Sequence, residues 1–221
     1  MLDAHQAASP GRFRGVRQSV ARDSHFPEGV VLRPAPAGML ADPRFRASLR
    51  SVGRQGLTFD AMLYQQQIPE LTALAREIDD VPIILDHIGC PLGVGHYRGR
   101  EAETFAAWRR EVAALAACPN VHLKFGGLGM IVTGAEYHLE KTPPTSARLA
   151  AAWRPFFDVA VTAFGTQRCL FESNFPVDKA MYSYPILWNA FKRLAAAASP
   201  AEKADLFTGT ARRLYRLTID A

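Results

Sequence analysis

Short apolar runs alternate with longer amphipathic patterns along the 221-residue chain. Residues 57–64 alternate with a period of two, which indicates a strand with four side chains on one face, those of Thr58, Asp60, Met62 and Tyr64. Residues 81–87 read Val-Pro-Ile-Ile-Leu-Asp-His, a continuous apolar run that is typical of a parallel strand buried on both faces. Further strands are predicted at 121–125 and 168–173, with a weaker pattern at 12–20.

Helical spacing fills the segments between these strands. We predict helices at 42–52, 68–78, 101–117, 145–164 and 184–197, then from Pro200 onward and at 210–217. Pro155 should kink or split its helix, Ser199 and Glu202 form a capping-box pattern, and Gly209 should separate the last two helices. Residues 23–43 are predicted to be an irregular loop. The alternation predicts parallel βαβ units, and a doubly wound sheet or part of a barrel would satisfy it equally well.

Composition and charge narrow the class of protein. The chain is 48% hydrophobic and 21% charged, which fits one globular domain over residues 1–221. The net charge is +5, but the basic residues are scattered, so we do not expect binding to nucleic acid. Three widely spaced cysteines and the lack of a long apolar run indicate a cytoplasmic protein without disulfides or a membrane span. The expected partner is a small-molecule substrate.

Polar residues collect where the predicted strands end. Asp86 and His87 end one strand, Lys124 lies at the end of another, and Glu172 and Asn174 follow the last. In parallel α/β folds the carboxyl ends of the strands form the edge where substrates bind. Taken alone, His87 is as consistent with a hydrogen bond to a neighbouring loop as with a catalytic role.

Four segments together carry a resemblance to a known family. Residues 81–91 resemble its Leu-Asp-His-x-Gly-x-Pro segment, and residues 119–128 resemble its Pro-Asn-Val-x-x-Lys-x-Ser-Gly-Leu strand. Residues 164–177 and the closing helix 210–217 are similar to its last strand and last helix. The family is the amidohydrolase-related one, which includes sugar lactonases and dicarboxylate lactone hydrolases. The resemblance implies a metal-dependent-hydrolase type of (β/α)8 TIM barrel with its site at the carboxyl ends of the strands.

The same resemblance implies that the barrel is incomplete. Residues 13–18 resemble the family's fourth strand, so the chain would cover strands 4 to 8 with their helices and would be an N-terminally truncated domain. The family's His-x-His pair, which supplies metal ligands, would then be missing. A divalent metal is therefore expected in a complete version of the domain and not in this chain. Five strands cannot close an eight-strand barrel, so a homo-oligomer or a partner chain is an open alternative.

The last strand departs from the family pattern in a chemically important way. The family's aspartate is Asn174 here, and an amide cannot take up a proton as a general base. Glu172 lies two residues earlier and would share a face with Asn174 in a strand. We therefore expect Glu172 or nearby Asp178 to be the catalytic base. The alternative is that Glu172 forms a buried structural ion pair with Lys124 or Arg17.

These observations lead to one functional hypothesis with two alternatives. The resemblance implies a hydrolase that opens a lactone-type ester of a small carboxylated or sugar-derived substrate by activating water. His87 and Arg17 would orient the substrate, Lys124 would supply positive charge, and Asp60 and Tyr64 are further candidates for substrate binding. The alternatives are a decarboxylase on the same fold and an inactive barrel fragment that needs its missing strands or a partner.

Overall fold

Five parallel strands form one sheet in which every neighbour in space is also the neighbour in sequence. The computed structural model describes residues 1–26 and 34–218. The strands are β1 (Gly15–Ser19), β2 (Thr58–Met62), β3 (Ile83–Leu85), β4 (Val121–Phe125) and β5 (Cys169–Phe171), in the order β1-β2-β3-β4-β5. A doubly wound sheet would reverse its strand order at a switch point. The unreversed order is consistent with a (β/α)-barrel-like sheet.

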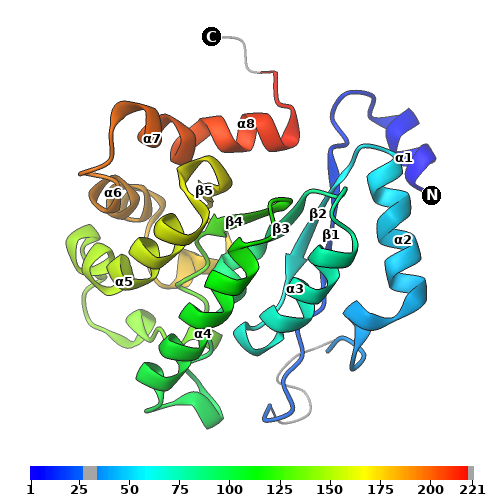
Figure 1. Cartoon of the computed structure of the whole chain (residues 1–221). Coiled ribbons are helices and arrows are strands. Elements are labelled where there is room, and N and C mark those ends of the chain that lie inside the picture. The colour runs from blue at the N-terminus through cyan, green and yellow to red at the C-terminus, as the bar shows by residue number, and fades with distance from the viewer. Residues whose placement is uncertain (27–33, 219–221) are drawn as a thin grey trace.

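The strands are connected by helices that lie side by side along the sheet (Figure 1). The α-helices of the described residues are α1 (Leu2–Ala8), α2 (Pro43–Arg54), α3 (Ile68–Glu77), α4 (Glu101–Ala116), α5 (Ser146–Phe164), α6 (Tyr184–Leu194), α7 (Pro200–Ala204) and α8 (Thr210–Tyr215). Within those residues, no helix is both long and apolar enough to cross a membrane.

The observed elements follow the predicted ones closely, with three corrections. The strands predicted at 81–87 and 168–173 are shorter, because the chain turns after Leu85 and after Phe171. Pro155 was predicted to kink or split its helix, and the split does not occur: α5 is one helix, and Trp153 and Phe157 on either side of the proline are both buried in the core. Gly209 does not separate the last helices.

The end of the chain instead forms one continuous helical run. Gly209 has right-handed helical dihedrals and ends a π-helical turn, Asp205–Gly209, that joins α7 to α8. The predicted capping box is confirmed, since Ser199 accepts from the Glu202 backbone and Glu202 accepts from the Ser199 backbone. Of the predicted loop 23–43, residues 27–33 lie outside the described residues, and Met39–Ala41 form a 3-10 turn.

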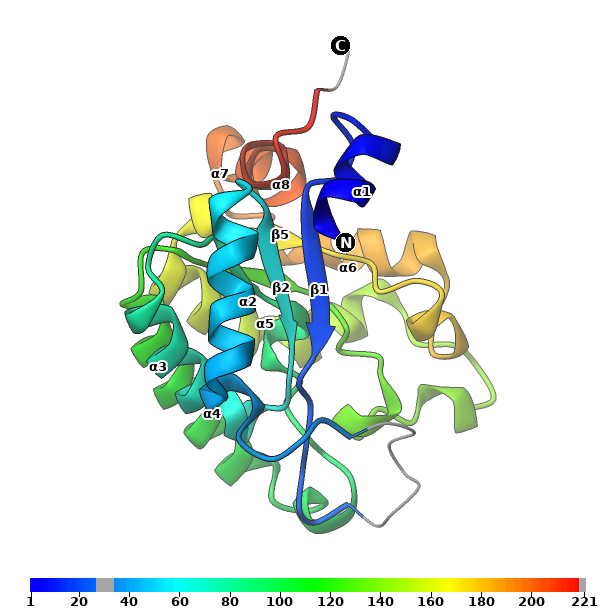
Figure 2. The same ribbon diagram turned by 90° about the vertical axis from the view of Figure 1, so that its right-hand side faces the viewer.

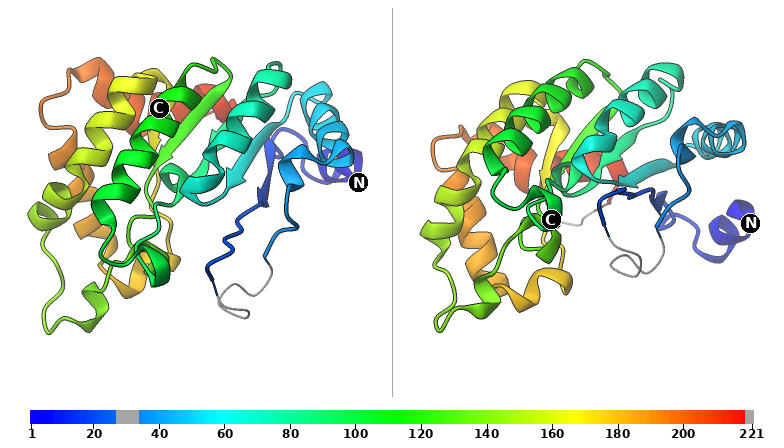
Figure 3. Two further views of the ribbon diagram at one scale, coloured as in Figure 1. Left: turned by 60° about the horizontal axis from the view of Figure 1, so that its bottom comes forward. Right: turned by 90° about the horizontal axis from the view of Figure 1, so that it is seen from below.

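The two faces of the sheet differ in chemistry. One face carries apolar side chains such as Phe59, Ile83 and Leu123, and α2 to α5 cover it (Figure 3). The other face is called the inner face below. Ile84 and Leu170 on this face pack against Leu214 of α8. Helix α8 lies near the amino ends of the strands (Figure 2). Toward the carboxyl ends the inner face becomes charged, and this part of the molecule holds the candidate site.

Candidate functional site

Six polar side chains meet at the carboxyl end of the inner face. They come from β1, β2 and β4, from the turn after β3 and from the residue that follows β5. Because parallel strands end at the same edge of a sheet, residues far apart in sequence lie next to one another there. This inner cluster consists of Arg17, Asp60, Asp86, His87, Lys124 and Glu172.

Lys124 links two carboxylates of the inner cluster. Its Nζ lies 2.5 Å from Asp60 Oδ2 and 3.0 Å from Asp86 Oδ1, and its side chain is only 14% exposed. Burial by itself would lower the pKa of Lys124, but the charges of Asp86 and Asp60 outweigh it and raise that pKa above its ordinary value. Lys124 is therefore a fixed positive charge at neutral pH.

Asp86 is the most deeply buried acid of the inner cluster. Its side chain has no exposed surface, and Arg17 Nε lies 2.9 Å from its Oδ2. Burial raises the pKa of Asp86, and the charges of Lys124 and Arg17 offset this only in part. Asp86 was predicted at the end of its strand, but no role in the site was assigned to it. The available signal was its position two residues after Ile84, which places it on the inner face.

His87 reaches the inner cluster through an unusual turn. Strand β3 ends at Leu85, and His87, Ile88, Gly89 and Cys90 all have positive φ, at 54°, 52°, 75° and 44°. Residues other than glycine rarely adopt this left-handed conformation, and a β-branched residue such as Ile88 does so least readily. The turn bends the chain so that His87 follows Asp86 onto the inner face.

Glu172 holds His87 by two hydrogen bonds to one oxygen. Oε1 of Glu172 lies 2.5 Å from His87 Nδ1 and accepts the backbone N–H of His87 at 3.0 Å. On the other side of the ring, Nη2 of Arg17 lies 2.8 Å from His87 Nε2. Because a guanidinium can only donate, Nε2 is the acceptor, and in the neutral ring the proton is on Nδ1. His87 is thus held in one tautomer by the two neighbours.

The hydrogen bonds also settle the charge state of Glu172. Burial alone would raise its pKa, but the hydrogen bonds and charge of His87 and the charge of Lys124 outweigh it and lower that pKa. Glu172 is therefore an ionised acceptor. Its partner is His87, whereas the alternative from the sequence had it paired with Lys124 or Arg17.

Two glycines after β4 make room for this pair. A Cβ at Gly126 would lie 2.3 Å from the Glu172 carbonyl oxygen, and one at Gly127 would lie 2.7 Å from His87 Cβ and Cγ. Gly127 also has a φ of 68°. The close approach of this segment to His87 and Glu172 therefore requires glycine at both positions.

Asn174 and Asp178 lie beside the inner cluster and form a group of their own. The expectation that Asn174 shares a strand face with Glu172 is wrong, because β5 ends at Phe171 and Asn174 has a φ of 51°. Its Nδ2 instead donates to Asp178 Oδ1 at 2.8 Å. Asp178 also accepts from Tyr182 Oη at 2.7 Å and from the Gly129 backbone at 3.3 Å, and it is fully buried.

Asp178 is consequently occupied by three donors. Burial raises its pKa even though these hydrogen bonds act against the rise. A carboxylate with this set of donors is suited to holding the loop after β5 in place. The geometry thus separates the two bases that the sequence proposed, since only Glu172 contacts the inner cluster.

One tyrosine that was predicted to lie in the site lies outside it, and one that was not predicted contacts the inner cluster. Tyr64 was expected on the face of Asp60, but β2 ends at Met62 and Tyr64 packs with Cys90 and Leu92 in a separate apolar group. Burial raises the pKa of Tyr64 to about 12. Tyr215 of α8 was not predicted, yet its Oη donates to Asp60 at 3.0 Å. Sequence patterns carry no signal for that contact, which spans 155 positions.

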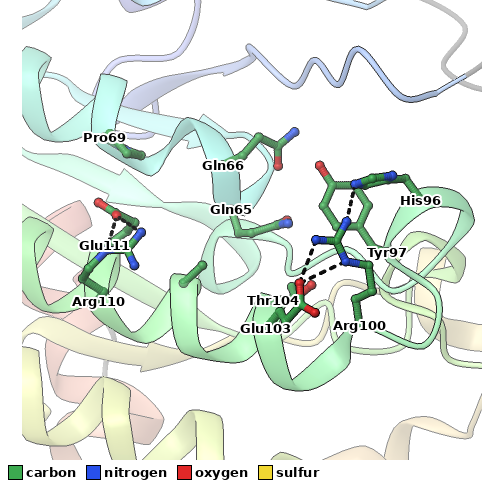
Figure 4. A pocket seen from close by; sticks show the side chains of 11 residues that line it. Gln65, Gln66, Pro69, His96, Tyr97, Arg100, Glu103, Thr104, Arg110 and Glu111 are labelled. Carbon is green, nitrogen blue, oxygen red and sulfur yellow. Dashed lines mark hydrogen bonds and ion pairs between the residues drawn. The ribbon is translucent and has the colours of Figure 1, made fainter.

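A pocket of about 340 Å³ on the helix side of the molecule is separate from the inner cluster (Figure 4). It lies between the beginning of α3 and the outer surface of α4. Its charged groups are paired with one another: Arg100 contacts Glu103 at 2.7 Å and His96 at 2.5 Å, and Arg110 contacts Glu111 at 2.8 Å. The chemistry of the inner cluster, with a histidine held between a carboxylate and a guanidinium, does not recur here.

Comparison with known proteins places the chain in a family. It is 35% identical over 218 residues to the uncharacterized protein y4mH of Sinorhizobium fredii, covering 98% of this chain and 65% of that protein. It is 31% identical over 160 residues to the L-fucono-1,5-lactonase of Burkholderia multivorans, covering 72% of this chain and 51% of that enzyme.

The fold matches as well. A crystal structure of a Burkholderia multivorans amidohydrolase with bound HEPES superposes with a TM-score of 0.78 at 27% identity, covering 98% of this chain and 70% of that one. A second crystal form of it contains bound zinc. This chain therefore spans 65% and 51% of the two curated relatives. The amidohydrolase family model matches residues 4–217, and the chain belongs to the amidohydrolase family.

Proposed function

We propose that the inner cluster is a hydrolytic site that opens a lactone-type ester, with His87 as general base and Glu172 as the carboxylate that orients it. The observation that carries this proposal is the 2.5 Å contact between His87 Nδ1 and Glu172 Oε1, which leaves Nε2 as the acceptor nitrogen of the ring. A histidine held in this tautomer by a carboxylate can take a proton from water through Nε2.

The reaction follows from these positions. His87 Nε2 removes a proton from a water molecule, and the water oxygen attacks the carbonyl carbon of the lactone. Arg17 and Lys124 stabilise the negative charge on the carbonyl oxygen. The ring C–O bond then breaks, and the leaving oxygen takes the proton from His87, so that a hydroxy acid is formed. Because Arg17 donates to Nε2 in the structure, it must move aside for the water. Its side chain is 50% exposed, which leaves room for this movement.

The charges of the inner cluster favour a sugar-derived substrate over a dicarboxylate. Three carboxylates face two cations, and both cations already contact carboxylates: Lys124 with Asp60 and Asp86, and Arg17 with Asp86. A doubly negative substrate would face a formal surplus of negative charge. Carboxylates at these positions can instead accept hydrogen bonds from hydroxyl groups. The lactonase relatives, which act on L-fucono-1,5-lactone according to their names, support the same substrate class.

The described residues do not fit a hydrolytic metal centre. Such a site needs about three protein ligands, and residues 1–26 and 34–218 contain no group of three His, Cys, Asp or Glu side chains arranged to hold an ion. Nδ1 of His87 is occupied by Glu172, and Lys124 lies between Asp60 and Asp86. The proposed reaction therefore involves no metal step.

The five strands are assigned, as part of the same proposal, to strands four to eight of a (β/α)8 barrel. Support comes from the unreversed parallel order and from the match to 70% of the solved amidohydrolase. Within the described residues β1 and β5 each pair with one strand only. An open strand edge favours pairing with another chain, so we expect homo-oligomers that depend on concentration. A monodisperse monomer in sedimentation velocity at all concentrations would contradict this expectation.

A product assay tests the reaction. The 221-residue protein is incubated with an aldono-1,5-lactone, and acid formation and carbon dioxide are measured separately. We expect acid without carbon dioxide, and we expect Glu172→Gln and His87→Gln to lose at least about 100-fold in kcat, as is usual for removal of a general base. The control Glu70→Gln, an exposed carboxylate of α3, should keep full activity.

Each other outcome has a definite meaning. Carbon dioxide release would identify a decarboxylase, and full activity of Glu172→Gln would remove Glu172 from the mechanism.

The three cysteines Cys90, Cys118 and Cys169 are free and buried. Free thiols support the proposed cytoplasmic location, because reducing conditions keep them unpaired.

A further inference from the structure

The turn that carries His87 is an unusual piece of backbone. Four consecutive residues, from His87 to Cys90, have positive φ, and only one of them is glycine. L-residues disfavour this conformation because Cβ approaches the carbonyl oxygen, so surrounding contacts must hold it. Such conformations in folded proteins concentrate at functional sites.

Contacts from two opposite sides hold the turn. On the inner face, Glu172 accepts the backbone N–H of His87 at 3.0 Å. On the helix side, the indole Nε1 of Trp108 in α4 donates to the carbonyl oxygen of Ile88 at 2.7 Å. Both Trp108 and Ile88 are completely buried, so water cannot replace the indole N–H as donor.

We propose that Trp108 is a positioning residue whose indole N–H holds the turn and thereby aims the His87 ring at Glu172. The inference rests on the proposed function of His87. Trp108 lies on the face of the sheet opposite to the inner cluster, so it acts through the backbone of residues 87 and 88 and touches no substrate. Without the indole N–H, the Ile88 carbonyl would be buried without this donor, and the turn would relax toward a less strained conformation.

The packing of Trp108 indicates a substitution that removes the N–H and keeps an aromatic ring. Its rings lie against Phe105, at 5.7 Å between ring centroids, and against Phe156, at 4.9 Å. Phenylalanine at this position keeps an aromatic side chain in the same apolar surroundings. Trp188 offers a matched control, because its buried indole nitrogen has no partner among the described residues.

The test observes the His87–Glu172 hydrogen bond directly. In a protein labelled with ¹⁵N-histidine, the Nδ1 proton of His87 should give a strongly downfield proton resonance, because its hydrogen bond to a carboxylate is short. The resonance is assigned by its loss in Glu172→Gln. We expect it to move or broaden in Trp108→Phe and to stay unchanged in Trp188→Phe. An unchanged resonance in Trp108→Phe would overturn the proposal.

Kinetics supply a second readout. A misplaced general base lowers kcat more than it raises KM, so Trp108→Phe should lose about 10- to 100-fold in kcat with KM within about twofold of the wild type. Equal kcat in Trp108→Phe and Trp188→Phe would overturn the positioning role. If the wild-type chain does not hydrolyse lactones at all, the proposed function fails, but the resonance still tests whether Trp108 positions His87.

A second variant covers the case in which Trp108→Phe does not fold. Tryptophan is replaced by β-(3-benzothienyl)alanine in a Trp153→Phe, Trp188→Phe background, which leaves position 108 as the single site of replacement. The analogue keeps the two-ring shape and substitutes sulfur for the N–H. A shifted or broadened His87 resonance supports the proposal, and an unchanged one overturns it.

Discussion

Lys124→Met removes the central positive charge of the inner cluster while keeping a side chain of similar length. Lys124 lies 2.5 Å from one Asp60 oxygen and 3.0 Å from one Asp86 oxygen. The Asp86 side chain has no exposed surface, and those of Asp60 and Lys124 are 12% and 14% exposed. The substitution therefore leaves two mostly buried carboxylates without their shared counter-ion.

The expected loss of stability follows from these distances. At an effective dielectric constant of about 20, unit charges at 2.5 to 3.0 Å attract by about 5 to 7 kcal/mol per pair. Desolvation of the ammonium group offsets several kcal/mol of this attraction, and removing one partner of a buried pair costs about 3 to 5 kcal/mol. Arg17 stays with Asp86 and Tyr215 stays with Asp60. We therefore expect the lower end, about 3 kcal/mol in the free energy of unfolding at pH 8.

The loss should depend on pH in a defined direction. Burial already raises the pKa of Asp86, and Lys124 is the strongest influence that lowers it. Without Lys124 that pKa rises further, so Asp86 takes up a proton more readily as pH falls and its buried charge is neutralised. A carboxyl whose pKa is raised in the folded state stabilises the fold at low pH and loses that contribution as pH rises through its folded pKa. The destabilisation should thus be smaller at pH 5 than at pH 8.

Urea unfolding followed by tryptophan fluorescence at both pH values measures this effect. Lys192→Met, at an exposed position of α6, is the control and should change the unfolding free energy by less than about 0.5 kcal/mol. A loss below about 1 kcal/mol for Lys124→Met at pH 8 would refute the buried-pair reasoning. An equal loss at pH 5 and pH 8 would refute the role assigned to Asp86.

Three further changes test the surroundings of His87 and Asp60. Because the pKa of Glu172 is lowered in the folded state, its ionised form stabilises the fold above its ordinary pKa, and this contribution is lost as pH falls through the folded pKa. The unfolding free energy of Glu172→Gln should therefore fall less on acidification than that of the wild type. Gly127→Ala should lower the melting temperature more than Gly95→Ala does. Both glycines have positive φ, but a Cβ at position 127 would meet His87, whereas nothing lies within 4 Å of a Cβ at position 95. Equal melting temperatures would contradict the close approach of Gly127 to His87. Tyr215→Phe should cost about 1 kcal/mol in urea unfolding through loss of its hydrogen bonds to Asp60, and an unchanged midpoint would show that α8 contributes nothing there.

Local patterns predicted most of the secondary structure. Strand β4 has the predicted bounds, Val121–Phe125, because a Pro-Asn turn precedes its alternating side chains and two glycines follow them. The capping box at Ser199 was likewise predictable, since its hydrogen bonds join residues only three positions apart. The common edge of a parallel sheet explains why five of the predicted site residues lie in one cluster, although they come from separate strands.

The inaccurate predictions share a physical cause. The period of two holds only while the backbone stays extended, and it fails where residues adopt the left-handed conformation. This occurs at His87 and at Asn174, so Glu172 contacts His87 while Asn174 turns to Asp178. Side-chain polarity indicated that these residues are important, but it carries no information on the direction in which each one points.

The sequence by itself determined the alternation of strands and helices and the edge of the sheet that carries the candidate site. These properties depend on residue identity and on neighbours within a few positions. Only the tertiary structure decided that Glu172 pairs with His87, that Asp86 joins the cluster, and that Tyr215 reaches Asp60 from the end of the chain. Those contacts join residues 69 to 155 positions apart, and burial and charge pairing across such separations are set by the packing of the whole fold.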